Sequence, residues 1–238
     1  MADVRGAEPV APWWAGTLTV LDTETTGVDV ARDRIVSLAV VRVAPTGAVE
    51  PGSLTTLVDP GVPIPAGAAA VHGITTERAH ADGVPPGMAL RAAVPLLLRC
   101  RDEGAPVVIF NAPFDWPLLA AEARRHGVAL PAVPLLDPLL LDRHFDRYRR
   151  GSRRLADVAA HYRVRLDAAH SAEADAVATA GVARALVAAF PDELRHVSVA
   201  DLQARQALWY GQWRDSLNDY WARRGDPRRD TAEWPMGG

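Results

Sequence analysis

Apolar residues recur with two different periods along the chain, and each period predicts a different kind of element. In the first half, short apolar runs with β-branched residues predict strands at residues 17–21, 35–43 and 54–58. Gly47, Pro51 and Gly52 separate the second run from the third, so we expect a hairpin there and an antiparallel meander overall. The proline- and glycine-rich stretch that follows predicts a loop running through residues 72–75.

The second half alternates between short apolar runs and longer segments with helical spacing. The short runs predict strands at residues 107–110 and 135–136, the second leading into residues 138–145. The longer segments predict helices at residues 88–101, 114–126, 154–162 and 172–190. A meander followed by strand–helix alternation predicts an α/β fold, in which helices flank a mixed five-stranded sheet.

The two ends of the chain differ in character from this central domain, which we place at residues 16–190. Residues 1–15 are rich in Ala and Pro and predict a flexible leader, anchored by Trp13 and Trp14. Residues 191–238 predict a helical C-terminal extension, with aromatic residues on roughly one face of an amphipathic segment. Such a face more often packs on its own domain than binds a partner, and a homodimer or another protein contact is the alternative.

Composition narrows the class of protein without deciding its chemistry. With 238 residues, 49% of them hydrophobic, the chain is long enough for one sizeable domain and an appendage. A net charge of −3 argues against coating nucleic acid by bulk electrostatics, but is compatible with an acidic pocket that holds cations. The chain has no lysine, so any phosphate contacts must come from arginine, backbone amides or metal.

The single cysteine, Cys100, excludes an internal disulfide and a cysteine-based zinc site. Its position after an apolar run at helical spacing predicts a buried structural thiol. The start of the chain lacks the pattern of a secretory signal, and no apolar stretch approaches the roughly 20 residues of a spanning helix. We therefore expect a soluble cytoplasmic protein.

The first cluster of candidate catalytic residues is acidic and follows the first predicted strand. Asp22 and Glu24 are two residues apart, so on a strand they project from the same face. Two carboxylates held together repel each other, and a divalent cation would relieve that repulsion. Oxygen ligands of this kind suit Mg²⁺ or Mn²⁺. Alone, such a pair is more typical of turn and helix-capping acids, a common use of Asp after a strand.

Two further clusters follow later strands and helices. Asp115 lies near the start of a predicted helix, where a carboxylate could also act as a simple cap. His170 precedes the last helix of the domain, and Asp175 lies in that helix's first turns. If His170 folds back over the site, both side chains can reach it, although a lone His–Asp pairing is usually structural.

Taken together and in order, these motifs resemble those of the DnaQ-like exonucleases of the DEDDh group, which includes the proofreading epsilon subunit of bacterial DNA polymerase III. The matching segments are Leu21-Asp22-Thr23-Glu24-Thr25-Thr26-Gly27, His72-Gly73-Ile74-Thr75, Asn111-Ala112-Pro113-Phe114-Asp115 and His170-Ser171-Ala172-Glu173-Ala174-Asp175. The spacing of His170 and Asp175 fits the histidine subgroup. Each motif is short, but the ordered set is specific.

The resemblance implies a ribonuclease H-like fold whose acids hold two divalent ions, Mg²⁺ or Mn²⁺. Asp22 would bridge both ions, Glu24 and Asp175 would complete the first site, and Asp115 would support the second. His170 would be the general base that takes a proton from the attacking water. Activity should then rise from mildly acidic to mildly alkaline pH.

The resemblance also indicates which residues meet the substrate. Thr25, Thr26 and Gly27 would lie at the terminal 3′ nucleotide, with Gly27 permitting close approach or an unusual backbone angle. Residues of the other motifs would also bind substrate: His72, Ile74, Asn111 and Phe114. Phe114 is a candidate stacking platform, or it packs a helix on the sheet, and His72 could merely satisfy its own loop.

An arginine-rich segment follows the fifth predicted strand. It comprises Arg143, Arg147, Arg149, Arg150, Arg153 and Arg154, with Tyr148 among them. It is either a rim that guides phosphates to the pocket or a solvated link between helices, balanced by Asp142 and Asp146.

The function that these observations favour is metal-dependent 3′→5′ removal of nucleotides from single-stranded DNA. A ribonuclease of the same family is the first alternative, because the residues that sense the 2′-hydroxyl cannot be placed from the sequence. A catalytically idle nucleic-acid-binding module is the second. The resemblance makes a polymerase a possible partner of the C-terminal extension. We recognise no polymerase-docking segment there, which favours a stand-alone enzyme over a polymerase subunit.

Overall fold

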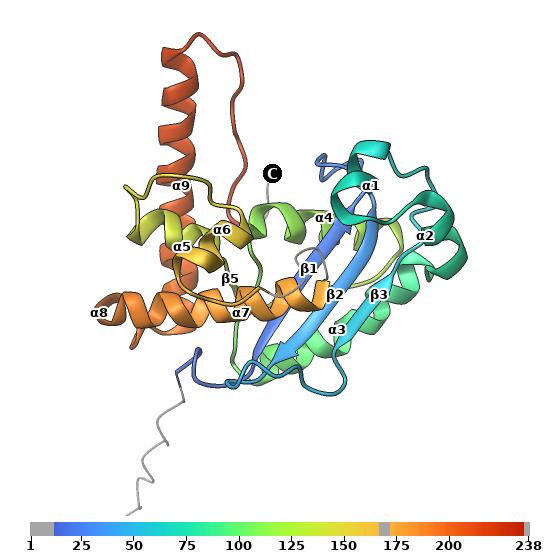
Figure 1. Ribbon diagram of the computed structural model, residues 1–238, viewed down its shortest axis with the longest axis horizontal. Coiled ribbons are helices and arrows are strands. Elements are labelled where there is room, and N and C mark those ends of the chain that lie inside the picture. The colour runs from blue at the N-terminus through green and yellow to red at the C-terminus, as the bar shows by residue number, and fades with distance from the viewer. Residues whose placement is uncertain (1–11, 167–171, 236–238) are drawn as a thin grey trace, which may run out of the picture.

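A computed structural model describes residues 12–166 and 172–235 of the chain, and within these ranges the backbone forms one sheet of five strands (Figure 1). The strands are β1 (Leu18–Thr25), β2 (Ile35–Val43), β3 (Leu54–Leu57), β4 (Val107–Val108) and β5 (Leu135–Leu136). Their spatial order is β3-β2-β1-β4-β5. β1 to β3 pair as an antiparallel meander, whereas β4 and β5 run parallel to β1. The predicted mixed five-stranded sheet is confirmed.

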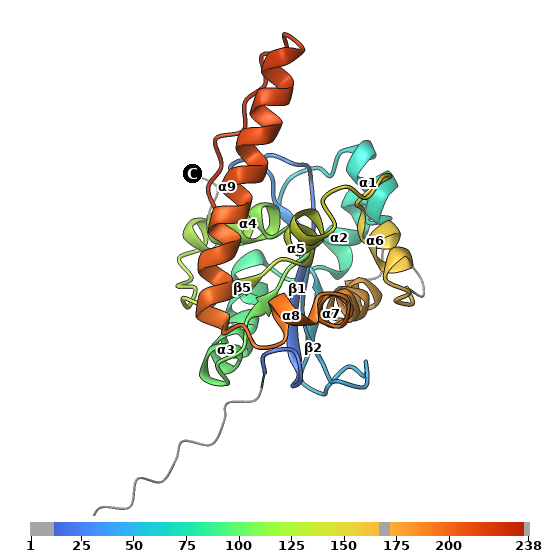
Figure 2. The ribbon, with the colours of Figure 1, turned by 90° about the vertical axis from the view of Figure 1, so that its left-hand side faces the viewer.

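Helices cover both faces of this sheet. The helices in the described residues are α1 (Ala66–His72), α2 (Thr76–Asp82), α3 (Pro86–Asp102), α4 (Ala112–Arg125), α5 (Pro138–Phe145), α6 (Leu155–His161), α7 (Ala172–Ala189), α8 (Pro191–Leu194) and α9 (Val199–Arg223). Figure 2 shows α3 and α4 on one side of the strands and α6 and α7 on the other.

Alternating residues of the strands supply a separate hydrophobic core on each face. Val20 and Val41 pack with α7, whereas Leu21 and Val40 pack with α3 and α4. Every residue of β2 is buried, which is expected of a strand covered on both sides. This double cover fixes the positions of the elements that carry the acidic residues.

The predicted loop that runs through residues 72–75 is wrong where it precedes residue 73, because α1 occupies residues 66–72, whereas residues 73–75 form a short link before α2. Ala-rich sequence favours the first helix. The Thr75 hydroxyl accepts a hydrogen bond from the backbone N–H of Arg78 and caps the second. Ile64, Ile74 and Ala79 pack with Val36 in a small third core, so the proline and glycine residues punctuate folded structure here.

The C-terminal extension begins as part of the domain and then leaves it. Gln206 of α9 is fully buried and bonds the backbone of β5, donating to Leu135 O (2.9 Å) and accepting from Asp137 N (2.7 Å). Figure 1 and Figure 2 both show the later half of α9 projecting beyond the body, with residues 226–235 returning along it. The start of α9 thereby covers the β5 edge of the sheet.

The structure also tests the predictions made for Cys100 and for the two tryptophans that precede β1. Cys100 is fully buried and lies near the Ala105 carbonyl, as expected of a structural thiol. Trp13 is buried in the core beside α7, and Trp14 donates to Arg195 O (3.2 Å), so both anchor the chain that precedes β1. Most of the predicted leader, residues 1–11, lies outside the described residues. Among the helices of the described ranges, none is both long and apolar enough to cross a membrane.

Candidate active site

Three carboxylates converge at the end of β1 where the parallel strands finish. Asp22 and Glu24 project from the same face of β1, and Asp175 lies in the first turn of α7. Each can offer one oxygen such that the three oxygens lie within 4.8 Å of one another. All three side chains are partly exposed, so the group opens to solvent. A strand and a helix that are far apart in sequence thus build one cluster of oxygen ligands.

A fourth carboxylate, Asp115, lies beneath this cluster in the first turn of α4. It is only 5% exposed and accepts two hydrogen bonds from Thr23, from the backbone N–H (3.1 Å) and from the hydroxyl (2.5 Å). Thr23 is the residue between Asp22 and Glu24, so these bonds fix α4 against β1 at the site. The role of Thr23 was missed in the sequence, although its place between two acids was visible.

The electrostatics of the site favour a bound cation. The pKa of Asp22 is raised well above its ordinary value, first by burial and then by the charges of Asp115, Glu24 and Asp175. Burial raises the pKa of Asp115 to about 7, although the two Thr23 hydrogen bonds oppose the shift. Divalent ions with oxygen ligands stabilise the ionised forms of such a cluster, so the donor set fits Mg²⁺ or Mn²⁺.

Asp137, which sequence reasoning did not single out, holds the loop that leads to Asp115. Its carboxylate accepts from the backbone N–H groups of Asn111 (2.9 Å) and Ala112 (3.1 Å). It also caps α5 by accepting from Leu139 N (2.8 Å). Burial raises its pKa to about 6. The signal was available, because an aspartate after a short apolar run and before a proline is a typical helix cap.

The rest of the first motif is fixed by its neighbours at the end of β1. The Thr25 hydroxyl donates to Gly27 O (2.6 Å), and the Thr26 hydroxyl donates to Asp33 (2.7 Å). A Cβ added at Gly27 would lie 2.5 Å from an oxygen of Asp33, whereas its φ is not in the left-handed region. Close approach, not an unusual backbone angle, therefore explains the glycine.

The second motif packs into the fold near the end of β1. His72 is 9% exposed, and its Nδ1 accepts from Ile74 N (3.1 Å). Burial lowers the pKa of His72, while the nearby Thr25 backbone opposes the shift. Ile74 is 6% exposed in the third core. His72 thus satisfies its own loop, as one of the two interpretations held, and also supports the end of β1.

The third motif leaves one aromatic ring available. Asn111 has a left-handed backbone (φ 70°), which turns the chain from β4 into α4, and its side chain is half-buried. Phe114 is also half-buried and is a member of none of the three hydrophobic cores. This position is compatible with a stacking platform beside Asp115. His170, the predicted general base, lies outside the described residues.

The arginine-rich segment divides between structural and exposed residues. Asp142 is fully buried and is paired with Arg149 (2.8 Å) and Arg153, and it accepts from the Tyr162 hydroxyl (3.1 Å). These two arginines therefore secure the link between α5 and α6. The exposed members of the segment are Arg147, Arg150 and Arg154.

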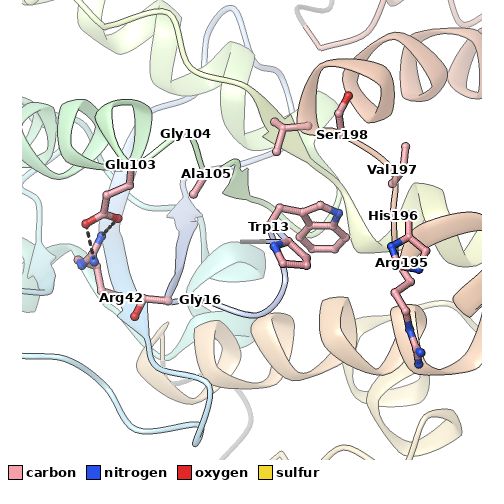
Figure 3. Close-up of a pocket in the computed structure, with 13 residues that line it drawn as sticks. Trp13, Gly16, Arg42, Glu103, Gly104, Ala105, Arg195, His196, Val197 and Ser198 are labelled. Atoms are coloured by element: carbon pink, nitrogen blue, oxygen red, sulfur yellow. Dashed lines mark hydrogen bonds and ion pairs between the residues drawn. The ribbon is translucent and has the colours of Figure 1, made fainter. Parts of the chain in front are cut away.

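A separate cavity of about 700 Å³ lies at the opposite end of β1 (Figure 3). Trp13, Arg195 and His196 border it, and Arg42 on its far side is held by Glu103 at 2.9 Å. Thr17 lines this cavity, whereas Asp22 and Glu24 lie at the other end of the strand. It is therefore distinct from the carboxylate cluster.

Comparison with known proteins agrees with this geometry. An exonuclease family model (RNase_T) matches residues 19–183, which is more than half of the chain. The chain belongs to this exonuclease family. The resemblance to DnaQ-like exonucleases is thereby confirmed, and the matched range includes all four carboxylates.

Individual relatives agree with the family assignment. A DNA polymerase III subunit epsilon-like protein of Rhodobacter capsulatus is 37% identical over 132 residues, covering 52% of this chain and 17% of that protein. The DNA polymerase III PolC-type of Lacticaseibacillus paracasei is 31% identical over 160 residues, covering 67% of this chain and 10% of that protein. The chain thus spans less than a fifth of the length of these relatives.

Solved structures share the fold. A structure of exonuclease I superposes with a TM-score of 0.65 at 21% identity, covering 76% of this chain and 43% of that chain. E. coli exonuclease I in complex with a dT13 oligonucleotide gives 0.62 at 21% identity, covering 74% and 42%. At this identity the likeness establishes a ribonuclease H-like exonuclease fold.

Proposed function

We propose that this chain is a metal-dependent 3′→5′ exonuclease of the DEDDh type, which removes nucleotides from the 3′ end of single-stranded DNA. The observation that carries the proposal is the convergence of Asp22, Glu24 and Asp175 above the buried Asp115, in a chain that belongs to an exonuclease family. A binding module would gain nothing from this repulsive arrangement, because four neighbouring acids repel a phosphate backbone unless cations are bound.

The same four carboxylates would hold the cations. Asp22 would contact two ions, Glu24 and Asp175 would complete the first site, and Asp115, which lies outside the 4.8 Å cluster, would support the second. When bound, a pair of divalent ions supplies an activated water and neutralises charge on the leaving 3′ oxygen. The ion would be Mg²⁺ or Mn²⁺, because every donor is a carboxylate oxygen.

The chain's own side chains would perform the remaining steps. An imidazole nitrogen of His170, five residues before Asp175, would take the proton from the attacking water. Thr25, Thr26 and Gly27 would meet the terminal nucleotide at the end of β1, with Phe114 stacking on a base. Hydrolysis of the phosphodiester then releases a mononucleotide and leaves a new 3′ end at the site.

DNA is the favoured substrate because the polymerase relatives and the exonuclease I complex with a dT13 oligonucleotide concern DNA. RNA is the second candidate, since all four acids would serve either sugar equally.

Digestion of 5′-labelled single-stranded DNA and RNA of matched sequence tests the proposal. We expect a ladder that shortens from the 3′ end in Mg²⁺ or Mn²⁺, and no shortening in EDTA. Asp22→Ala should abolish the ladder, whereas Asp82→Ala, which removes an exposed acid at the end of α2, should not. If neither strand shortens while both remain bound, the protein is a binding module and the proposal is wrong.

A further inference from the structure

A second cavity, of about 430 Å³, lies between α5 and α9. Its lining is unusual in a chain of net negative charge, because none of the described residues that form it is Asp or Glu. The lining is instead basic and aromatic, and its main members are Arg143, His144, Arg147, Arg153, Trp209 and Trp213. Below, this cavity is called the α5–α9 groove.

Ring contacts order the basic side chains of the groove. The guanidinium of Arg143 lies 4.2 Å from the ring centroid of Trp213, which is the arrangement of a cation–π pair. The His144 ring stacks on Trp209 at 4.1 Å with an interplanar angle of 17°. Arg143 and His144 of α5 thus lie against aromatic faces that α9 supplies.

Two of the three arginines keep their charge available. Arg153 is committed to Asp142, but neither Arg143 nor Arg147 forms an ion pair with any residue that the structure describes. Burial lowers the pKa of Arg143, and burial followed by the charge of Arg147 lowers the pKa of His144. The groove is therefore a positively charged recess in which an anion would be stabilised.

The groove is connected to the carboxylate cluster through α5. Asp137 caps the start of this helix and accepts from the backbone N–H groups of Asn111 and Ala112, in the segment that leads to Asp115. The same helix carries Arg143, six residues after Asp137, into the lining of the groove. One short helix therefore joins the support of Asp115 to the groove.

We propose that the α5–α9 groove binds a phosphate of the single-stranded substrate on the 5′ side of the nucleotide being removed. Arg143 and Arg147 would contact the phosphate, and Trp209 would offer its indole to a base. This combination of guanidinium and aromatic groups is sequence-tolerant, as an exonuclease requires. The inference rests on the proposed function for the position of the 3′ end, whereas the groove's charge and rings do not depend on it.

Comparison of a dinucleotide with a dodecanucleotide tests the groove. A dinucleotide has a single internucleotide phosphate, which the carboxylate site itself consumes, so it cannot also occupy the groove. Arg147 is exposed, so Arg147→Glu should fold normally. We expect this variant to raise KM for the dodecanucleotide by roughly tenfold, equivalent to one lost charged contact. KM for the dinucleotide and kcat for both should be unchanged.

The matched control is Arg91→Glu, which makes the same charge change at an exposed position on α3. It should leave both values of KM unchanged, and Arg147→Lys should retain most of the affinity. In EDTA, fluorescence anisotropy should show that Arg147→Glu weakens dodecanucleotide binding and lowers the slope of log affinity against log salt by roughly 0.7–1.

The outcomes separate the groove from the proposed function. Weaker binding in EDTA without any digestion by the unmodified protein would support the groove and contradict the exonuclease. Normal digestion with equal KM for Arg147→Glu and Arg91→Glu would overturn the groove alone. If Arg147→Glu weakens the dinucleotide as much as the dodecanucleotide, or if inorganic phosphate binds with the same dependence on Arg147, the groove holds a free phosphate and the proposal is wrong.

Discussion

At the scale of single residues, the site carries a destabilising arrangement that only ligands can relieve. Asp115 is buried and its pKa is raised to about 7, against about 4 for an unfolded chain. The folded protein therefore holds this proton more tightly than the unfolded chain does. The resulting stability is fully present below about pH 4 and is lost as the pH rises through about 7. In the metal-free protein, ionisation of Asp115 thus opposes folding at neutral pH.

Asp115→Asn should remove this loss. The amide oxygen can still accept both hydrogen bonds from Thr23, so the packing of α4 on β1 is retained. In EDTA we expect the variant to gain stability over the unmodified protein as pH rises from about 5 to about 8, by an amount on the order of a few kcal/mol. Thermal unfolding across this range measures the difference.

Asp82→Asn is the control, because Asp82 is exposed. Its melting temperature should follow that of the unmodified protein at every pH. A constant difference between Asp115→Asn and the unmodified protein would contradict the pH argument. Saturating Mg²⁺ should raise the melting temperature of the unmodified protein and not that of Asp22→Asn, since a ligand that binds only the native state stabilises it.

The proposed general-base role of His170 gives a second prediction at this scale, which kinetic measurements test. A histidine with a pKa of about 6.5 is largely neutral above pH 7 and can accept a proton. In a metal-saturated assay we expect kcat to rise from mildly acidic to mildly alkaline pH. His170→Ala should lower kcat by roughly 10²–10⁴-fold and remove most of that rise. A flat profile for the unmodified enzyme would contradict the general-base role.

At the scale of elements, α7, the helix that carries Asp175, packs so closely on its neighbour at Gly181 that no larger side chain fits there. A Cβ built on Gly181 in α7 would lie 2.6 Å from Cγ1 of Val164, in the segment after α6. Alanine is the better helix former by about 1 kcal/mol, but overlap with a β-branched side chain costs about 1–3 kcal/mol. Gly181→Ala should therefore lower the free energy of unfolding.

Gly211 in α9 is the matched case, because a Cβ there meets nothing within 4 Å. Gly211→Ala should raise stability by roughly 0.5–1 kcal/mol, since only the helix-propensity term remains. Urea unfolding of both variants checks the pair. Equal effects in the same direction would show that the contact between α7 and Val164 is not restrictive.

The elements most accurately predicted were those with a long, regular pattern. The predicted strand at residues 35–43 coincides with β2, and the helices at residues 88–101 and 172–190 agree with α3 and α7 to within two residues. The strand predicted at residues 17–21 extends to Thr25 as β1, because β2 pairs along its whole length. The short α1, α2 and α8 were missed, since one or two turns carry little periodicity.

At the scale of the whole molecule, the ordered motifs predicted which acids meet, because the ends of neighbouring strands bring them to one edge of the sheet. They could not predict the support of the site. Asp137 reaches back over 25 residues to Ala112, and Gln206 reaches 71 residues to Leu135. Such contacts depend on how layers stack, and one sequence contains no local signal for them.

These long-range contacts couple the C-terminal extension to the edge of the sheet that carries the carboxylates. Gln206 of α9 binds the carbonyl of Leu135 in β5 and the N–H of Asp137 directly after it. The carboxylate of Asp137 in turn holds the N–H groups of Asn111 and Ala112 at the head of α4, three residues before Asp115. The first half of α9 is therefore a structural part of the domain, and its loss should affect catalysis.

Gln206→Leu tests this coupling in the full chain. The substitution keeps a side chain of similar size but leaves a buried N–H of Asp137 and a buried carbonyl of Leu135 without partners, at about 1–3 kcal/mol each. We expect a loss of stability of roughly 2–5 kcal/mol and a lower kcat on the dinucleotide, measured at a temperature where the variant is still folded. The control is Gln212→Leu, six residues further along α9 in the lining of the groove. It should leave both the stability and the kcat on the dinucleotide nearly unchanged. Normal kcat in a destabilised Gln206→Leu would show that α9 stabilises the sheet without positioning Asp115.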